Sequence, residues 1–189
     1  SGVVNAYCLL RPPGHHAGPN GRVWGGDTQG FCFFNNVAIA AKYAMYRYPQ
    51  RIRRVAIFDF DVHHGNGTEE IFMHDDDVLF ISIHAYGEGF YPASGLDSEA
   101  RNIVNIPLPI GFKSNEFHNA CEQVYRRIEH HNPDIIFLSA GMDAREDDTI
   151  MKDSVEETYE SNSRKTRSNG RMSWGMPPCS CQGSAGLSG

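Results

Sequence analysis

Two aspartates and a histidine occur at alternate positions at the end of an apolar run, in the segment VAIFDFDVHHGNGTEE of residues 55–70. On a β-strand, residues two apart point to the same face, so we expect Asp59, Asp61 and His63 to form a row. Such a buried group is unfavourable unless it is compensated, and a divalent metal ion would compensate it. The alternative is a salt-bridged or helix-capping cluster.

A further acidic residue follows a later apolar run. The segment DIIFLSAGMDA places Asp143 just past a predicted strand and a glycine. Because the carboxyl ends of parallel strands meet at one edge of a sheet, we expect Asp143 to face Asp61 and His63 there. Two carboxylates and one imidazole would form an open metal site with a position left for water. Zinc is the first choice, and iron or another divalent ion remains an alternative.

A pair of adjacent histidines occurs in the segment RPPGHHAG, framed by prolines and glycines. Imidazole titrates near neutral pH, so we interpret His15 and His16 as a general base and its helper, acting beside the metal site. The alternative is that both are loop histidines hydrogen-bonded to the backbone.

The apolar pattern predicts the elements that would position these residues. Short β-rich runs alternate with helical segments, which is typical of an α/β fold with a parallel sheet. The expected helices cover residues 36–48 and 114–131, and the expected strands cover residues 55–62, 78–83, 103–106 and 134–140. Residues 1–150 would form one domain, and residues 151–189, which lack apolar periodicity, a divergent and disordered tail.

Composition restricts the class of protein. The formal net charge of −6 disfavours direct sequence-specific nucleic-acid binding and suits a basic partner. Five irregularly spaced cysteines argue against a secreted disulfide framework. With no long apolar stretch and no signal-peptide pattern, we expect a soluble intracellular protein of the nucleus, the cytoplasm or both, without membrane association.

Five segments together resemble the zinc-dependent histone deacetylase family, near its class II branch and the bacterial acetylpolyamine amidohydrolases. They are, in chain order, RPPGHHA, GFCFFNNVAIAA, FDFDVHHGNGTEEIF, HAYGEGFYP and LSAGMDA. The resemblance runs from about Asn5 to Asp148 and implies a parallel-sheet arginase/deacetylase-type fold with helices on both faces. The family's members are longer, so residues 1–150 resemble a central fragment of the catalytic domain, incomplete at both ends.

The resemblance implies a role for each polar residue of these segments. Zinc would be held by Asp61, His63 and Asp143. The catalytic group would consist of His16 as general base and acid, His15 as its electrostatic partner, Asp59 orienting His15, and Asn66 supporting His16.

The resemblance also implies a substrate tunnel and a second cation. Gly30, Phe31 and Tyr91 would line the tunnel that holds the acetyl-lysine stem, where the family usually has phenylalanine in place of Tyr91. A potassium ion would be bound by Asp59, Ser82 and the backbone carbonyls of Asp61, His63 and Ile83. The alternative for Ser82 is an ordinary strand serine.

The activity implied is hydrolysis of N-acetyl-lysine amides in histones or other proteins, releasing acetate, with a part in chromatin regulation and in a corepressor complex. Two alternatives remain open. One is an acetylpolyamine or other small-amide hydrolase, and the other is a truncated, inactive zinc-binding product. The second arises because the 189 residues lack the family's Gly-Gly-Tyr motif, whose tyrosine steadies the oxyanion; Tyr159 lies in the different context EETYES.

Overall fold

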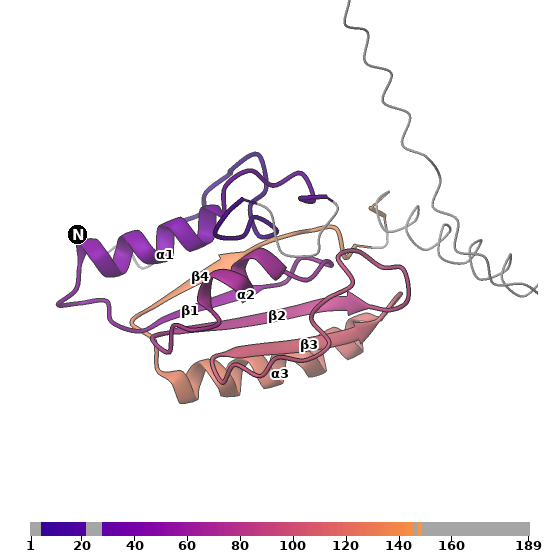
Figure 1. The fold of residues 1–189 in the computed structure, drawn as a ribbon. Helices are drawn as coiled ribbons and strands as arrows, with labels where there is room; N and C mark the ends of the chain where they lie inside the picture. The colour runs from indigo at the N-terminus through magenta and orange to yellow at the C-terminus, as the bar shows by residue number, and fades with distance from the viewer. Residues whose placement is uncertain (1–4, 22–27, 146, 149–189) are drawn as a thin grey trace, which may run out of the picture.

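A four-stranded parallel sheet forms the centre of the fold, seen in a computed structural model that describes residues 5–21, 28–145 and 147–148. The strand order is β3-β2-β1-β4, so the strand that carries the first aspartate of the motif is internal (Figure 1). The strands are β1 (Val55–Asp59), β2 (Val78–Tyr86), β3 (Ile103–Pro109) and β4 (Ile135–Ser139).

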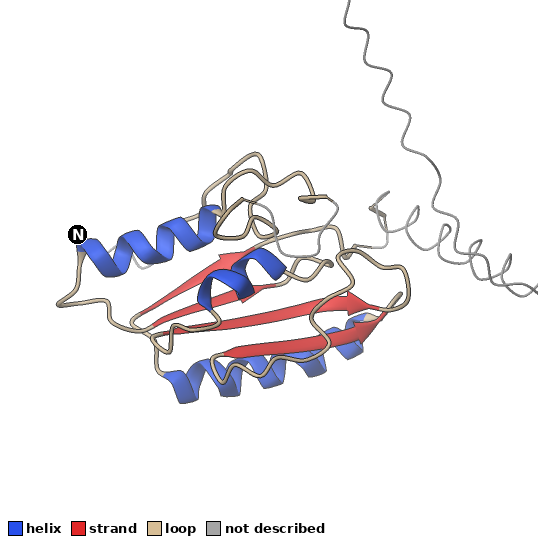
Figure 2. Ribbon diagram, viewed as in Figure 1, coloured by secondary structure: helices blue, strands red, loops and turns tan. Residues whose placement is uncertain are grey.

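Helices cover both faces of the sheet, as Figure 2 shows. They are α1 (Asn36–Arg47), α2 (Asn66–Phe72) and α3 (Ser114–His131). Alternate strand residues face opposite sides. Ile57 and Phe80 pack with α1 and α2, whereas Ala56 and Ile81 pack with α3. The sheet is therefore apolar on both faces, which is the pattern expected of a parallel sheet between two helical layers.

Local sequence explains where the two longer helices begin and end. Asn35 caps α1 by accepting a hydrogen bond from the Ala38 amide at 3.1 Å, and the buried alanines of α1 allow close packing on the sheet. At the start of α3 the Glu116 carboxylate accepts from the Lys113 amide at 2.8 Å. The helix stops at Asn132, whose φ of 50° is left-handed.

The predicted α/β fold is confirmed, and its two helices and four strands are present with differences in their bounds. β2 and β3 each continue three residues beyond the predicted ends, to Tyr86 and Pro109. The first strand ends at Asp59 rather than at residue 62, because the Asp59 side chain accepts the Asp61 amide at 3.1 Å and the chain turns there. Helix α2 was not predicted, since its seven residues are too short to show apolar periodicity. The predicted tail of residues 151–189 lies outside the described residues. Within the described residues, no helix is long and apolar enough to cross a membrane.

The connections between strands place the loops after β1 and β4 at the same edge of the sheet. From β1 the chain proceeds through β2 to β3 on one side, and β4 then pairs with β1 on the other side. The two crossovers use opposite faces, with α2 between β1 and β2 and α3 between β3 and β4 (Figure 1). The loops that follow β1 and β4 therefore lie side by side at the carboxyl edge, which is where ligands bind in open α/β sheets.

Replacing Ile57 tests the importance of the central strand. Ile57→Ala removes a fully buried side chain, and we expect the free energy of unfolding to fall by about 2–5 kcal/mol because a cavity remains. Urea unfolding followed by circular dichroism measures the change. The matched control is Ile39→Ala, where the side chain is 56% exposed and the effect should be within about 0.5 kcal/mol. Equal losses in the free energy of unfolding at the two positions would contradict the assignment of Ile57 to the core.

Candidate active site

The structure brings together three of the predicted residues as a cluster of possible metal donors. Asp61 and His63 lie in the loop after β1, and Asp143 lies in the loop after β4. Their donor atoms all lie within 4.8 Å of one another. His63 Nδ1 is 3.0 Å from Asp61 Oδ1 and 3.0 Å from Asp143 Oδ2. Two carboxylate oxygens and an imidazole nitrogen are a donor set that fits zinc.

Backbone hydrogen bonds hold the two loops in this arrangement. The Val62 amide donates to Asp143 Oδ1 at 3.0 Å, which ties the β4 loop to the β1 loop. The His63 amide donates to Asp61 Oδ1 at 2.8 Å. A side chain at Gly141 would place its Cβ 2.1 Å from Asp61 Oδ2, so the close approach of the loops requires glycine there.

The cluster is electrostatically suited to a cation. Burial disfavours the charged imidazole of His63, but hydrogen bonds from His63 to Asp143 and Asp61 outweigh this and raise its pKa to about 9. The pKa of Asp61 lies below its ordinary value, because interactions with His63 and His15 outweigh the effect of burial. In the metal-free chain a proton supplies the positive charge between the carboxylates, and a divalent ion would replace it.

Asp59 is placed apart from the metal donors. It is fully buried at the end of β1, and its Oδ2 lies 2.9 Å from His15 Nδ1. The expected row of Asp59, Asp61 and His63 is not formed, because the strand ends at Asp59 and the chain turns before the other two. Asp59 is therefore positioned to support the histidine pair rather than the ion.

The two adjacent histidines are buried with their rings in contact. The ring centroids of His15 and His16 are 3.9 Å apart. His16 Nδ1 lies 2.7 Å from the Asn66 side-chain oxygen at the start of α2. Because an amide oxygen only accepts, Nδ1 of His16 carries the hydrogen and Nε2 keeps a lone pair. His15 Nδ1 likewise donates to Asp59.

Their surroundings push the two histidines toward opposite charge states. For His15, burial disfavours the charged form, but the carboxylates of Asp59 and Asp61 outweigh it and raise the pKa to about 9. For His16, burial and the positive charge of His15 lower the pKa to about 3. Near neutral pH the first ring is charged and the second is a neutral proton acceptor.

Aromatic residues stand over the donor cluster. The ring centroid of Tyr91 is 4.9 Å from that of His16 and 6.1 Å from that of His63, and the Tyr91 hydroxyl donates to the Thr28 carbonyl at 3.2 Å. Phe90, which sequence reasoning did not select, stacks on His63 at 5.3 Å. Of the predicted tunnel residues, Tyr91 therefore lies against both His16 and His63.

The other two predicted tunnel residues lie on the opposite loop. A Cβ at Gly30 would lie 2.3 Å from His16 Cδ2, so this residue borders the histidine directly. Phe31 is 81% exposed and has a positive φ of 64°. Its side chain thus projects outward beside the site, in a backbone conformation that is uncommon for a bulky residue.

Of the residues predicted for potassium, Asp59 lies on β1, Ser82 and Ile83 lie on β2, and Asp61 and His63 lie in the loop after β1. Asp59 and Ser82 are opposite each other in the register of β1 and β2, and both are fully buried. Ser82 Oγ lies 2.9 Å from His84 Nδ1. The Ile83 side chain packs in the core on the α3 face, so only its backbone carbonyl is available to an ion on this side.

A second buried histidine pair was missed by sequence reasoning. The ring centroids of His64 and His84 are 4.6 Å apart, and both side chains are almost fully buried. Two features of the sequence could have indicated this pair. His64 directly follows His63, and His84 lies two residues after Ser82 and so on the same face of β2.

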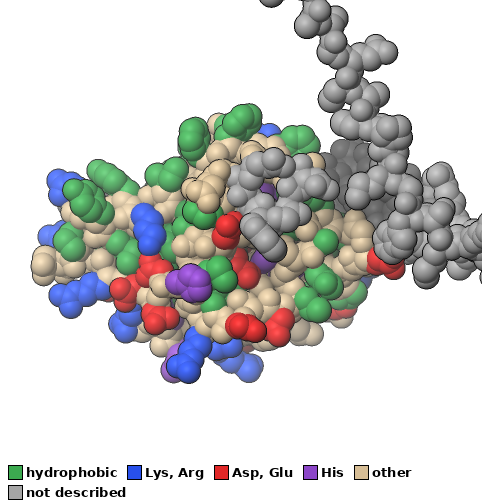
Figure 3. Space-filling model, in the orientation of Figure 1, with side chains coloured by type: hydrophobic (Ala, Val, Ile, Leu, Met, Phe, Trp, Pro, Cys, Tyr) green, Lys and Arg blue, Asp and Glu red, His purple; other side chains and the backbone are tan. Residues whose placement is uncertain are grey.

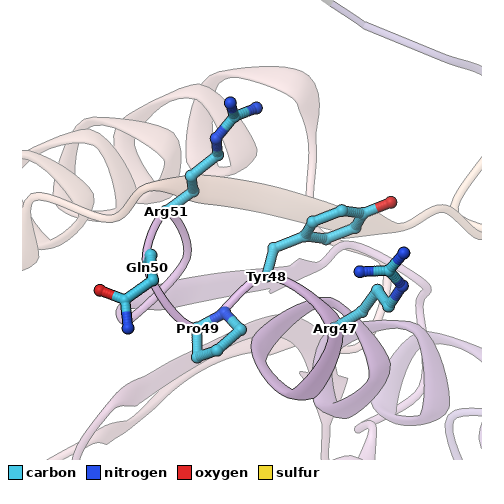
Figure 4. A pocket seen from close by; sticks show the side chains of 5 residues that line it. All are labelled: Arg47, Tyr48, Pro49, Gln50 and Arg51. Atoms are coloured by element: carbon cyan, nitrogen blue, oxygen red, sulfur yellow. The ribbon is translucent and has the colours of Figure 1, made fainter.

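A hollow at the far end of the sheet has no comparable chemistry. It lies just after α1, beside the start of β1, and Figure 4 shows the Arg47 and Arg51 side chains on either side of Tyr48. The Arg47 guanidinium lies 5.2 Å from the Tyr48 ring centre. Figure 3 shows basic side chains at this end of the molecule. The hollow contains no carboxylate, thiol or imidazole, so it offers no metal donors.

Known proteins share this sequence and fold. The chain is 46% identical over 160 residues to type-2 histone deacetylase 2 of Dictyostelium discoideum, covering 78% of this chain and 9% of the relative. The structure of an acetylpolyamine aminohydrolase from Burkholderia pseudomallei is 39% identical with a TM-score of 0.65, covering 76% of this chain and 41% of that one. The HDA15 HD domain is 33% identical with a TM-score of 0.65, covering 82% and 46%.

The chain thus spans less than half the length of each of these relatives. Its similarity to them extends beyond the motifs, because residues 1–173 match the family described as the histone deacetylase domain. The chain belongs to the histone deacetylase family.

Proposed function

We propose that this chain carries the reaction centre of a zinc-dependent deacetylase that hydrolyses N-acetyl-lysine amides in histones or other proteins and releases acetate. The observation that carries the proposal is the neutral, buried His16 next to the candidate donor cluster, with 6.1 Å between the ring centroids of His16 and His63. We propose acetylated proteins as substrates and a corepressor complex as the setting, on the basis of family membership.

The donor cluster fits the metal that the family generally requires. Asp61, His63 and Asp143 would hold zinc, because their donor atoms lie within 4.8 Å of one another and include two carboxylates and an imidazole. Bound zinc supplies a Lewis acid that polarises the amide carbonyl and makes water more acidic.

Proton transfer falls to the histidine pair. His16 accepts a proton from the attacking water at Nε2, because its Nδ1 is committed to Asn66. The neighbouring charge of His15 makes the protonated form of His16 a strong acid, which then gives the proton to the departing lysine amine. Asp59 keeps His15 charged and fixed in orientation throughout.

The aromatic residues select the shape of the substrate. Tyr91 on one loop and Phe31 on the other would hold the apolar stem of acetyl-lysine, while Gly30 leaves room beside His16. A long aliphatic stem with a small amide at its tip fits such a passage, since only its end must reach the donor cluster.

A potassium ion is proposed below this centre. Asp59 and Ser82 face each other across β1 and β2, and the carbonyls of Asp61, His63 and Ile83 would complete the oxygen ligands. A buried cation there would balance Asp59, whose pKa burial raises.

The resemblance to the bacterial acetylpolyamine aminohydrolase favours a second candidate, hydrolysis of small acetylated amines at the same centre. A third candidate, a chain that binds zinc without hydrolysis, shares the donor cluster but not the reaction. The experiments below separate the three.

Two substitutions separate metal binding from catalysis. Asp143→Ala removes a donor, and we expect zinc affinity to fall at least about 100-fold in competition with a chromophoric chelator. His16→Ala should keep zinc affinity and lower the rate of peptide deacetylation by about 10²–10⁴-fold, because the proton acceptor is lost. Asp147→Ala, at an exposed ion pair with Arg145, is the control and should change neither property. Zinc binding with no hydrolysis by the unsubstituted chain would contradict the proposed activity.

The charge of His15 depends on Asp59, which a titration can test. In the metal-free chain, Asp59→Asn should lower the pKa of His15 from about 9, because the main charge that opposes burial is removed and only Asp61 remains to raise it. In the unsubstituted chain this raised pKa stabilises the fold below about pH 6.5, and the contribution is lost as the pH rises through 9. NMR titration of the imidazole signals measures the shift. An unchanged His15 pKa would show that Asp59 does not control it.

The substrate class is decided by a side-by-side assay of an acetyl-lysine peptide and N-acetylspermidine on the zinc-loaded chain. We expect kcat/KM to favour the peptide, because the chain belongs to the histone deacetylase family. A preference for N-acetylspermidine would instead support the polyamine candidate.

A further inference from the structure

The second histidine pair forms a polar cluster beneath the loop that carries the aromatic wall. His64 follows β1 and is 2% exposed, and His84 lies on β2 and is 0% exposed. Neither belongs to the proposed donor cluster nor to the proton-transfer pair. One nitrogen of each ring contacts the loop of residues 87–95. The other nitrogen contacts Glu69 of α2 in the case of His64 and Ser82 of β2 in the case of His84.

His84 connects the loop to the central sheet. Its Nε2 donates to the Gly95 carbonyl at 3.0 Å, and since a carbonyl only accepts, Nε2 carries the hydrogen. Its Nδ1, 2.9 Å from Ser82 Oγ, then accepts from the serine hydroxyl. The ring thereby links the end of the loop to the middle of β2.

His64 makes a parallel connection to helix α2. Its Nδ1 lies 2.8 Å from Ser94 Oγ, and its Nε2 lies 3.0 Å from Glu69 Oε2. The same carboxylate oxygen accepts from the Asn105 side chain of β3 at 2.9 Å. The loop is therefore anchored through buried polar contacts to α2, and through Glu69 to β3.

Gly95 is required for this contact. Its φ is +86°, and a Cβ there would lie 2.5 Å from His84 Nε2 and 2.6 Å from His64 Cγ. The backbone of the loop thus rests directly on both rings, with no space for a side chain between them.

The anchored loop carries the aromatic residues that face the site. Phe90 stacks on His63 with an interplanar angle of 12°, and the Tyr91 ring contacts His16. Within the loop the Ala93 amide donates to the Phe90 carbonyl at 2.9 Å, which joins the aromatic segment to the anchored end. Movement of residues 94 and 95 would consequently shift the aromatic wall.

We propose that His64 and His84 are positioning residues that clamp the loop of residues 87–95 to the sheet and so fix Phe90 and Tyr91 over the donor cluster. The consequence for substrate rests on the proposed function, whereas the clamp itself does not. A loosened clamp would weaken the grip on the substrate stem more than it would slow the proton transfer at His16.

Ser94→Ala is the principal test, because it removes one contact of the clamp without touching a metal donor. Amide hydrogen exchange of residues 87–95 should accelerate about fivefold, the effect of one lost hydrogen bond, while exchange in β1 stays unchanged. Zinc affinity should stay within twofold. In the peptide assay KM should rise about fivefold with kcat within twofold. Leu96→Ala, at a side chain that is 60% exposed, is the matched loop control and should change none of these quantities.

His84 provides a second comparison through rescue. His84→Gln keeps an N–H group directed at the Gly95 carbonyl, whereas His84→Leu keeps none. We expect slower loop exchange in the glutamine variant than in the leucine variant. Unchanged loop exchange in both Ser94→Ala and His84→Leu would overturn the proposal. If the unsubstituted chain hydrolyses nothing, the proposed function fails, and the exchange measurements still decide the clamp.

Discussion

The fully buried carboxylate of Asp59 is the constraint on which the rest of the site depends. A charge at the end of the central strand is unfavourable without a partner, and His15 supplies one at 2.9 Å. The same carboxylate accepts the Asp61 amide and turns the chain out of the strand. One side chain therefore ends β1, directs Asp61, a candidate metal donor, to the edge and attaches the N-terminal loop with its two histidines.

Close backbone contacts complete this attachment. The start of α2 lies against the histidine loop so tightly that a Cβ at Gly67 would be 2.5 Å from the Ala17 carbonyl oxygen. The Thr68 amide donates to the His15 carbonyl at 3.1 Å, and Asn35 at the start of α1 donates to the Ala17 carbonyl at 3.1 Å. The orientation of the histidine pair is thus determined by two helix N-termini as well as by its side-chain partners.

Sequence reasoning brought the candidate donors Asp61, His63 and Asp143 together because sheet topology can be predicted from short apolar segments, whereas the row predicted from strand alternation is not formed. Asp143 could be assigned to the same edge as Asp61 since both follow apolar runs of a parallel sheet. The end of β1 could not be predicted, because it depends on a side-chain hydrogen bond of Asp59 that apolar spacing does not reveal. Likewise His84 occupies a strand position where an apolar side chain would fit, and its role depends on a loop eleven residues later in the chain.

The separation of the donors along the chain links metal binding to the integrity of the sheet. Asp61 and His63 belong to the central strand's loop, whereas Asp143 belongs to the loop of β4, which among the described strands pairs only with β1. An ion shared by these loops would act as a clip on the edge strand, adding about 2.7 kcal/mol of stability at a free metal concentration 100 times the dissociation constant. Metal starvation would loosen the pairing of β4 with β1, and the exposed Ile136 and Leu138 side chains of β4 would then promote self-association.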